Sequence, residues 1–492
     1  MADDSSPQAK GARPGQRDLT QGPISRTLLA FALPTLASSI LQSLNGSINS
    51  VWVGRFLGEE ALAATSNANI VMFLLMAFVF GFGMASTILI GQAFGRRDVD
   101  GARRVLGTAI GAFLLVATAI AVAGWVFSPA LLRLLRTPAG AAPLALAYLR
   151  VIFLAIPGSL MMIMLMMALR GGGDAMTPLW FMILVVILDS GLNPVFILGL
   201  GPAPALGIAG SATATVIANY TGLTAMLVYI YARDLPLRLR GGELRYLLPD
   251  RAILRTIVFK GLPMGLQMIV ISASALALIG LVNREGVETT AAFGVAMQLW
   301  TYLQMPAMAL GAAVSAMTAQ NIGAGRWERV SAITRAGVIF ALLITAVLVI
   351  LLAVADRPAL ALFLGGHSPA LPIARHIQIL ATWSFLMFGV TLVLFGTVRA
   401  NGAVIGPLVI LFIGLVPVRL GFALGGYGWL GADALWLSFP VSSFANMALA
   451  IAFYLHGGWR KSRMQAEPPG TDECIEEALA DAEPGGRLRP SG

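Results

Sequence analysis

A carboxylate and an amide lie one helical turn apart inside a long apolar segment. Asp189 follows Pro178 by eleven residues, near the middle of that segment, where an acid costs about 2.5–3.5 kcal/mol in a membrane. Asn193 comes four residues later, so both side chains lie on one helical face. Burial disfavours the charged carboxylate, which lets a proton and a cationic ligand compete for it. The pair predicts an ion-coupling site; the alternative is an Asp189 that only hydrogen-bonds neighbouring helices.

A polar stripe crosses an earlier apolar segment. Its four members are spaced by four, three and four residues: Ser38, Gln42, Asn45 and Asn49. One face of a helix carries them all, and such a face should contact protein or water rather than lipid. The stripe could complete the Asp189 site, or it could supply hydrogen bonds between helices.

Two further sets of polar residues lie inside apolar segments. Segment 206–232 contains four that could line a binding cavity or only pack: Thr213, Thr215, Asn219 and Tyr220. Arg419 follows Pro407 by twelve residues, at nearly the depth of Asp189 in its own segment. For Arg419 a structural hydrogen bond within or between the halves of the protein is favoured over contact with substrate.

Patterns of other chemistry are absent from the sequence. The three histidines, His367, His376 and His456, have no metal-ligand spacing. No Gly-rich phosphate loop of the ATPase pattern occurs, so an ion gradient, not nucleotide hydrolysis, should supply energy. A membrane enzyme would need paired carboxylates, a histidine cluster or a nucleophile with a base, and none is seen. We therefore expect no enzyme and no cofactor, with Na⁺ or H⁺ as coupling ion.

The elements that position these residues are membrane-spanning helices. Hydrophobic residues make up 57% of the 492 residues and charged residues 12%, which is far from a soluble composition. Continuous apolar runs long enough to cross a bilayer favour helices over barrel strands. The predicted fold is all-α with about twelve spans at 27–50, 61–89, 105–128, 143–169, 177–199, 206–232, 253–282, 289–318, 331–355, 371–397, 404–427 and 430–456.

The positive charges indicate the orientation in the membrane. An even number of spans puts both termini on one side, which carries 25 Lys and Arg residues against 7 on the other. The positive-inside rule then places both termini in the cytoplasm and the protein in the inner (plasma) membrane. The net charge of +9 thus comes from Lys and Arg residues in the loops and termini on the cytoplasmic side, and no nucleic-acid partner is expected. The first polar residues contain no cleavable signal, so the first span should be its own anchor.

The chain contains an internal duplication. Leu33 and Pro34, Gln92, Gly95, Pro143, Arg170, Gly173 and Pro178 recur in order at an offset of 229 or 228 residues. A constant offset over this length predicts a duplicated six-span unit, with both copies in one orientation. The expected organisation is an N-terminal segment (1–25), an N-terminal lobe (26–232), a linker (233–252), a C-terminal lobe (253–458) and a disordered acidic tail (459–492).

Five motifs resemble those of the multidrug and toxic compound extrusion (MATE) family, part of the multidrug/oligosaccharidyl-lipid/polysaccharide flippase superfamily. They are the Leu-Pro pairs at 33–34 and 262–263, INSVWVGRFLGEEALAAT, GQAFGRRDVDGARR, LRGGGDAMTP and PALGIAGSATATVIANY. The resemblance implies two six-helix lobes around a V-shaped cavity, exporting amphipathic, often cationic compounds against Na⁺ or H⁺. Asn49 stands where many relatives have an acid.

The predicted function is therefore multidrug efflux by cation antiport. A flippase for a lipid-linked saccharide is the alternative, although an anionic headgroup would call for more cations in the cavity than Arg419. An integral-membrane enzyme is the second, disfavoured alternative. The expected partners are small amphipathic or cationic organic substrates and the lipid bilayer, and the protein is expected to be a monomer.

Overall fold

The N-terminal lobe (N-lobe) consists of five helical elements. The structure is a computed structural model that describes residues 18–134, 142–200, 204–365 and 368–464, and within these ranges every regular element is a helix. The N-lobe elements are α1 (Ile24–Gly95), α2 (Val99–Leu134), α3 (Ala142–Gly171), α4 (Met176–Leu198) and α5 (Ile208–Ala232). Element α1 contains the first two predicted spans. Both of its ends lie beside Gln320, which contacts Leu19 and Gly95, so these two spans return to the same end of the molecule.

The C-terminal lobe (C-lobe) repeats this arrangement with more breaks. Its elements are α6 (Arg251–Val282), α7 (Val287–Gly323), α8 (Trp327–Val354), α9 (Asp356–Leu364), α10 (Ala370–Ala381), α11 (Ser384–Ala400), α12 (Ile405–Ile413), the π-helical turn η3 (Gly414–Leu420), α13 (Gly421–Gly425), α14 (Tyr427–Leu430) and α15 (Asp433–His456). The tenth span bends by 47° between α10 and α11. The eleventh runs through α12, η3 and α13.

The predicted all-α layout of twelve spans is confirmed. In the described residues, nine helices are long and apolar enough to cross a membrane, and the bent α10–α11 pair makes a tenth. The second half of α1 and the 37-residue α7 complete the set. Helices are the expected outcome because each satisfies its backbone polar groups internally, as a lipid environment requires.

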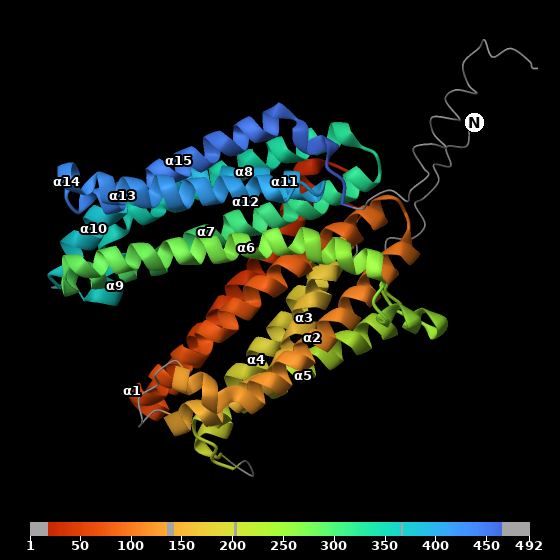
Figure 1. Cartoon of the computed structure of the whole chain (residues 1–492), viewed down its shortest axis with the longest axis horizontal. Helices are drawn as coiled ribbons and strands as arrows, with labels where there is room; N and C mark the ends of the chain where they lie inside the picture. Colours follow the sequence, from red (N-terminus) through yellow and green to blue (C-terminus); the bar gives the residue numbers. More distant parts are fainter. Residues whose placement is uncertain (1–17, 135–141, 201–203, 366–367, 465–492) are drawn as a thin grey trace, which may run out of the picture.

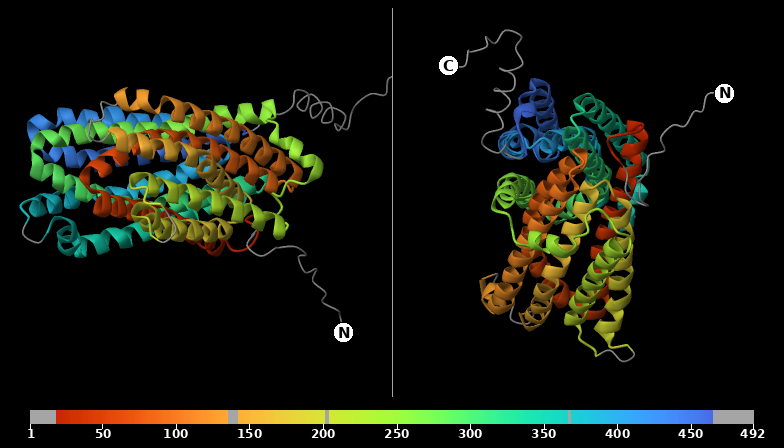
Figure 2. Two further views of the ribbon diagram at one scale, coloured as in Figure 1. Left: turned by 90° about the horizontal axis from the view of Figure 1, so that it is seen from below. Right: turned by 90° about the vertical axis from the view of Figure 1, so that its right-hand side faces the viewer.

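The two lobes form separate bundles that are joined at one end. Figures 1 and 2 show α1–α5 and α6–α15 as two groups that meet near the N-terminal segment and the linker and diverge toward the opposite end. Two glycines permit the contact. A Cβ on Gly95 would lie 2.0 Å from the Gln320 carbonyl oxygen, and one on Gly323 would lie 2.0 Å from that of Gln92. We call the region around these four residues the closed end.

A symmetric pair of buried hydrogen bonds ties the lobes together at the closed end. Gln92 of α1 donates to the carbonyl oxygen of Ala400 in α11 at 2.7 Å. Gln320 of α7 donates to the carbonyl oxygen of Gly171 in α3 at 3.0 Å. The two donors are equivalent positions of the duplication, and so are the two acceptors. The repeated landmarks of the sequence therefore meet where the lobes join.

The segment that precedes the first span packs on the C-lobe. Leu19 is fully buried. Its backbone N–H donates to Oε1 of Gln320 at 3.2 Å, and its carbonyl oxygen accepts from Asn321 at 3.0 Å. Arg326 donates to the carbonyl oxygen of Thr20 at 2.7 Å. This segment thus adds contacts to the closed end.

The disordered tail was predicted to begin at residue 459, and this boundary is too early in the chain. Trp459 and Met464 are 1% and 2% exposed, and the amide of Asn401 donates to the carbonyl oxygens of Trp459 and Arg460 at 3.0 Å. Two large apolar side chains and two hydrogen bonds therefore fix the first tail residues, which the acidic composition beyond them concealed. Residues 465–492, with Cys474, lie outside the described residues.

Candidate functional site

Asp189 is the centre of a buried polar cluster in the N-lobe. Its side chain is 2% exposed. Asn45 of α1 donates to Oδ2 at 2.7 Å, while Oδ1 accepts from Thr215 of α5 at 3.1 Å and from Asn193 of α4 at 3.2 Å. Three helices thus supply one hydrogen-bond donor each. Two of the three donors, Asn45 and Thr215, are far from Asp189 in the sequence.

Local sequence features bring α4 and α5 to this position. Asp174 starts α4 by accepting from the backbone N–H groups of Met176 and Thr177 at 3.1 and 2.9 Å, which satisfies donors that a helix leaves free. Burial raises the pKa of the Asp174 carboxyl, and the hydrogen bonds from Thr177 oppose this effect. Gly210 lets α5 approach α4, because a Cβ there would lie 2.2 Å from the Phe196 carbonyl oxygen.

The cluster contains carboxylate and amide oxygens but no positively charged side chain among the described residues. Within the described residues, no Lys or Arg pairs with the Asp189 carboxylate. Asn45 and Asn193 each use their amide nitrogen on Asp189, and the Oδ1 atoms of both are buried without a hydrogen-bond partner. Buried polar atoms normally have partners. A carboxylate beside two free amide oxygens is a donor set that suits a hard cation or a proton.

The other residues predicted from the stripe divide into two groups. Asn49 accepts a hydrogen bond from Ser211 of α5, so it joins the network one turn from Asn45. Gln42 is exposed, and the hydroxyl of Ser38 donates to the carbonyl oxygen of Pro34 in its own helix. The stripe therefore splits along its length, with its second half facing the Asp189 cluster.

Three of the four predicted residues in α5 bind backbone groups instead of Asp189. Thr213 donates to the Ala209 carbonyl oxygen at 2.7 Å, and Asn219 donates to that of Thr215 at 2.9 Å. Tyr220 donates to the Leu154 carbonyl oxygen of α3 at 3.1 Å and is 39% exposed. Of this set, only Thr215 contacts the carboxylate.

Arg419 lies in the other lobe, inside the π-helical turn. Its Nε donates to the hydroxyl of Ser442 in α15 at 3.0 Å, and its guanidinium carbon lies 4.5 Å from the centre of the Phe439 ring. Both partners belong to the C-lobe. The hydrogen bond seen is thus the intralobe one of the alternatives considered for this residue.

Two polar contacts escaped prediction from the sequence. Ser211, the partner of Asn49, lies four residues before Thr215, and that spacing could have placed it on the same face. In the C-lobe the indole of Trp300 donates to Gln378 and Thr382, both at 3.0 Å, and packs 4.9 Å from the Phe439 ring. No local pattern connects Trp300 of α7 with Gln378 of α10, with Thr382 directly after α10 or with Phe439 of α15.

The chain resembles known proteins in both sequence and fold. The MatE family model matches residues 34–195 and 263–424. The chain is 36% identical over 441 residues to the probable multidrug resistance protein YoeA of Bacillus subtilis, covering 89% of this chain and 95% of that protein. It is 30% identical over 455 residues to YpnP, another probable multidrug resistance protein of Bacillus subtilis, covering 92% and 99%.

The fold agrees with a solved structure. A crystal structure of MATE in complex with MaD3S matches with a TM-score of 0.81 at 22% identity, covering 90% of this chain and 97% of that chain. The two ranges of the family match are offset by 229 residues, which is the offset of the landmarks found in the sequence. The chain, with its two matching halves, therefore belongs to the multidrug and toxic compound extrusion (MATE) family of efflux transporters.

Proposed function

We propose that this protein exports amphipathic, cationic compounds in exchange for H⁺ or Na⁺, and that Asp189 and Asn193 form the coupling site. One observation carries the proposal. A carboxylate that is 2% exposed lies inside a spanning helix, without a cationic partner among the described residues and beside two unpartnered amide oxygens. Such an expensive group usually marks function in a membrane protein.

Exchange follows from competition for one negative charge. An ionised Asp189 attracts a cationic substrate, whereas a bound proton or Na⁺ neutralises it and lowers that attraction. The side chains of Asn45 and Asn193 can turn either the amide nitrogen or the amide oxygen toward the carboxyl. They therefore fit both the ionised and the neutralised state of Asp189. If the lobes rock about the closed end, the site meets one side of the membrane and then the other.

The orientation is part of the proposal. The excess of positive residues, 25 against 7, supports placing both termini, the linker and the closed end in the cytoplasm. The divergence of the lobes would then face outward. A cysteine introduced at Gly241, in a Cys474→Ser background, should resist a membrane-impermeant maleimide in intact cells and react in everted vesicles. Labelling in intact cells would show that the orientation is reversed.

The central experiment measures uptake of a fluorescent cationic dye into everted vesicles under separately imposed proton and sodium gradients. Asp189→Asn keeps the shape of the side chain but removes its charge, so it should abolish gradient-driven uptake while the protein still inserts. Asp189→Ala shows the effect of losing the hydrogen bonds as well. Glu288→Gln, at an exposed site, is the matched control and should transport normally.

The outcomes separate coupling from structure. A structural Asp189 would leave the Asn variant with normal ion-dependent transport, because an amide still makes hydrogen bonds, and that result would refute the proposal. The response of the native protein to each gradient identifies the ion. If only the sodium gradient drives uptake, Na⁺ should also protect the native protein, but not Asp189→Asn, against thermal unfolding.

A further inference from the structure

A cavity of about 400 Å³ lies between the start of α2 and the linker that joins the lobes. The linker contains the short helix η1 (Gly241–Leu247) and leads into α6. The lining residues are Arg104, Thr108, Arg245, Tyr246, Leu248 and Asp250. We call this cavity the linker pocket. It is distant from the Asp189 cluster and takes no part in the exchange proposed above.

Two arginines and one acid line the linker pocket. The guanidinium groups of Arg104 and Arg245 lie 5.5 and 5.6 Å from the centre of the Tyr246 ring. Arg104 pairs with Asp100 through its Nε at 2.9 Å and also interacts with Tyr246, and its side chain is still 55% exposed to a ligand. Within the described residues, Arg245 pairs with no carboxylate.

The acid in the pocket wall is already committed. Asp250 accepts from the backbone N–H groups of Ala252 and Ile253 at 2.8 and 3.2 Å, which caps the start of α6. Its charge is therefore directed at the helix rather than at the two arginines of the pocket. An anion entering the pocket would meet the guanidinium groups of Arg104 and Arg245.

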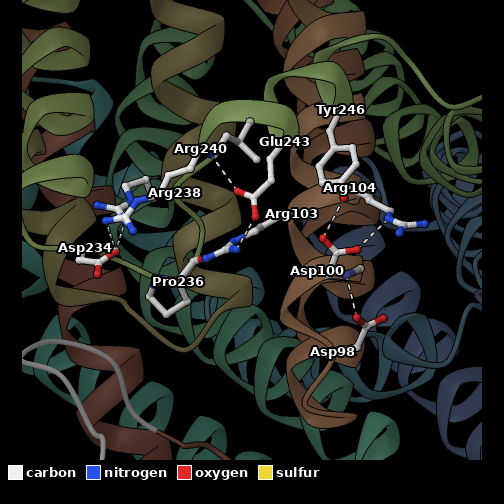
Figure 3. A network of polar contacts seen from close by, with 12 residues as sticks. Asp98, Asp100, Arg103, Arg104, Asp234, Pro236, Arg238, Arg240, Glu243 and Tyr246 are labelled. Atoms are coloured by element: carbon white, nitrogen blue, oxygen red, sulfur yellow. Dashed lines mark hydrogen bonds and ion pairs between the residues drawn. The ribbon is translucent and has the colours of Figure 1, made fainter.

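The pocket is held in shape by contacts between the linker and α2, which Figure 3 shows. Arg103 pairs with Glu243 at 2.7 Å and donates to the Pro236 carbonyl oxygen at 2.7 Å. Tyr246 donates to Asp100 at 2.9 Å. Gly111 allows close packing, since a Cβ there would lie 1.8 Å from the Leu247 carbonyl oxygen.

The rim of the pocket is apolar and exposed. Leu248 of the lining is 77% exposed, and Leu244 of η1 is 52% exposed. In α6, the helix that follows the linker, Phe259 is 66% exposed and Arg255 lies 5.5 Å over its ring. Since α2 and α6 enter the membrane from this end, apolar side chains around a cationic pocket here match a molecule with a charged head and a hydrocarbon body.

We propose that the linker pocket binds the phosphate headgroup of an anionic phospholipid from the adjacent leaflet. Arginine is suited to phosphate oxygens because its planar donors can engage two of them together. Basic pockets at the ends of membrane helices are known to take such headgroups. Arg104 and Thr108 belong to α2 of the N-lobe, whereas Arg245 and Leu248 lie on the linker that leads into α6. A lipid in the pocket therefore links α2 to the linker.

The test compares lipid binding by the native protein and by charge-neutral variants. Purified protein is titrated with phosphatidylglycerol or phosphatidylcholine, and bound lipid is counted by native mass spectrometry while thermal stability is followed. The native protein should retain phosphatidylglycerol selectively and be stabilised by it. Arg104→Gln with Arg245→Gln should bind it roughly 25-fold more weakly, from about fivefold for each charge. The control pair, Arg26→Gln with Arg335→Gln, removes two exposed arginines elsewhere and should bind as the native protein does.

Three results would overturn the proposal. They are equal binding by the pocket variant and the native protein, equal loss in the control pair, and full stabilisation by glycerol phosphate, which would assign the pocket to a soluble anion. Arg245→Gln alone keeps every contact of Arg104 and guards against misfolding of the double variant. It should still weaken phosphatidylglycerol binding about fivefold, and an unchanged affinity would count against the site.

Discussion

Asn45 and Gln42 lie three residues apart in α1, yet only Asn45 contacts Asp189. Asn45→Ala removes a 2.7 Å hydrogen bond to the carboxylate and one free amide oxygen. A hydrogen bond to a charged group contributes about 1.5–3 kcal/mol and stabilises the ionised carboxylate, so its loss should raise the apparent affinity for a coupling proton roughly 10- to 150-fold. Loss of the amide oxygen as a ligand should instead weaken the binding of a coupling Na⁺. The measurement is the ion concentration that gives half-maximal dye transport.

Gln42→Ala is the matched control for this prediction. It truncates an exposed amide on the same helix, and its ion dependence should equal that of the native protein. Equal changes in ion affinity for Asn45→Ala and Gln42→Ala would mean that the helix, rather than the contact with Asp189, governs ion binding.

Arg419 is predicted to stabilise the C-lobe through Ser442. Arg419→Met and Ser442→Ala each break the 3.0 Å hydrogen bond, at a cost of about 1.5–3 kcal/mol. Because both variants remove one interaction, the loss of thermal stability in the double variant should be smaller than the sum of the single losses. Additive losses, together with an altered range of substrates in Arg419→Met alone, would instead assign Arg419 to substrate contact.

At the scale of single residues, the sequence identifies the functional residues better than it identifies the residues that they contact. The depth of Asp189 and the four-residue spacing to Asn193 are local, so both could be found without a structure. The contact with Asn45 spans 144 positions and depends on how α1 packs against α4. The stripe indicated that one face of α1 is polar, but the point at which that face turns away from the cluster, between Gln42 and Asn45, is set by tertiary packing.

Among the helices, α1 and α7 are predicted to control the closed end. The bonds from Gln92 to Ala400 and from Gln320 to Gly171 cross between lobes and must break if that end opens. Together they contribute about 1–3 kcal/mol, so Gln92→Ala with Gln320→Ala should raise the population that is open there by roughly 5- to 150-fold.

Spin labels on exposed sites at the closed end can measure this change. Labels at Arg96 and Glu328, in a Cys474→Ser background, report the distance between the lobes by electron–electron double resonance. The double variant should show a larger fraction of long distances than the native protein. Gln298→Ala, an exposed amide on the same helix as Gln320, is the control. An unchanged distance distribution would mean that the glycine contacts and the N-terminal segment suffice to hold the end closed.

Helix boundaries were largely predictable, but helix interruptions were not. Each apolar run is continuous across the α10–α11 bend of 47° and across the π-helical turn at Gly414–Leu420. Hydropathy records only the length of a run, whereas a bend depends on which carbonyl oxygens find other partners. Pro417 lies inside the π turn, yet Pro194 and Pro306 lie inside α4 and α7, so proline alone did not mark the breaks.

At the scale of the whole molecule, the duplication predicts two lobes of equal topology that need not carry equal chemistry. The repeat places Gln92 and Gln320 in equivalent bonds at the closed end. The buried acid Asp189 belongs to the N-lobe, and Arg419 occupies a comparable depth in the C-lobe. The constant offset revealed the symmetry. The docked N-terminal segment, which hydrogen-bonds to Gln320, Asn321, Arg326 and Arg329 of the C-lobe, could not be predicted from the repeat.

The last prediction is that the lobes assemble without a covalent link. Gly241 and Gly242 lie in the linker with no atom near the position of a Cβ, so a chain break between them removes no side-chain contact. The halves 1–241 and 242–492, expressed together, should copurify and restore gradient-driven dye transport, because the closed end supplies the two buried bonds and the glycine contacts. Activity should be lower than in the intact chain, since tethering raises the effective concentration of one lobe at the other. Each half expressed alone provides the control and should not transport. Halves that insert and copurify without transporting would show that continuity of the linker is itself needed for the movement between conformations.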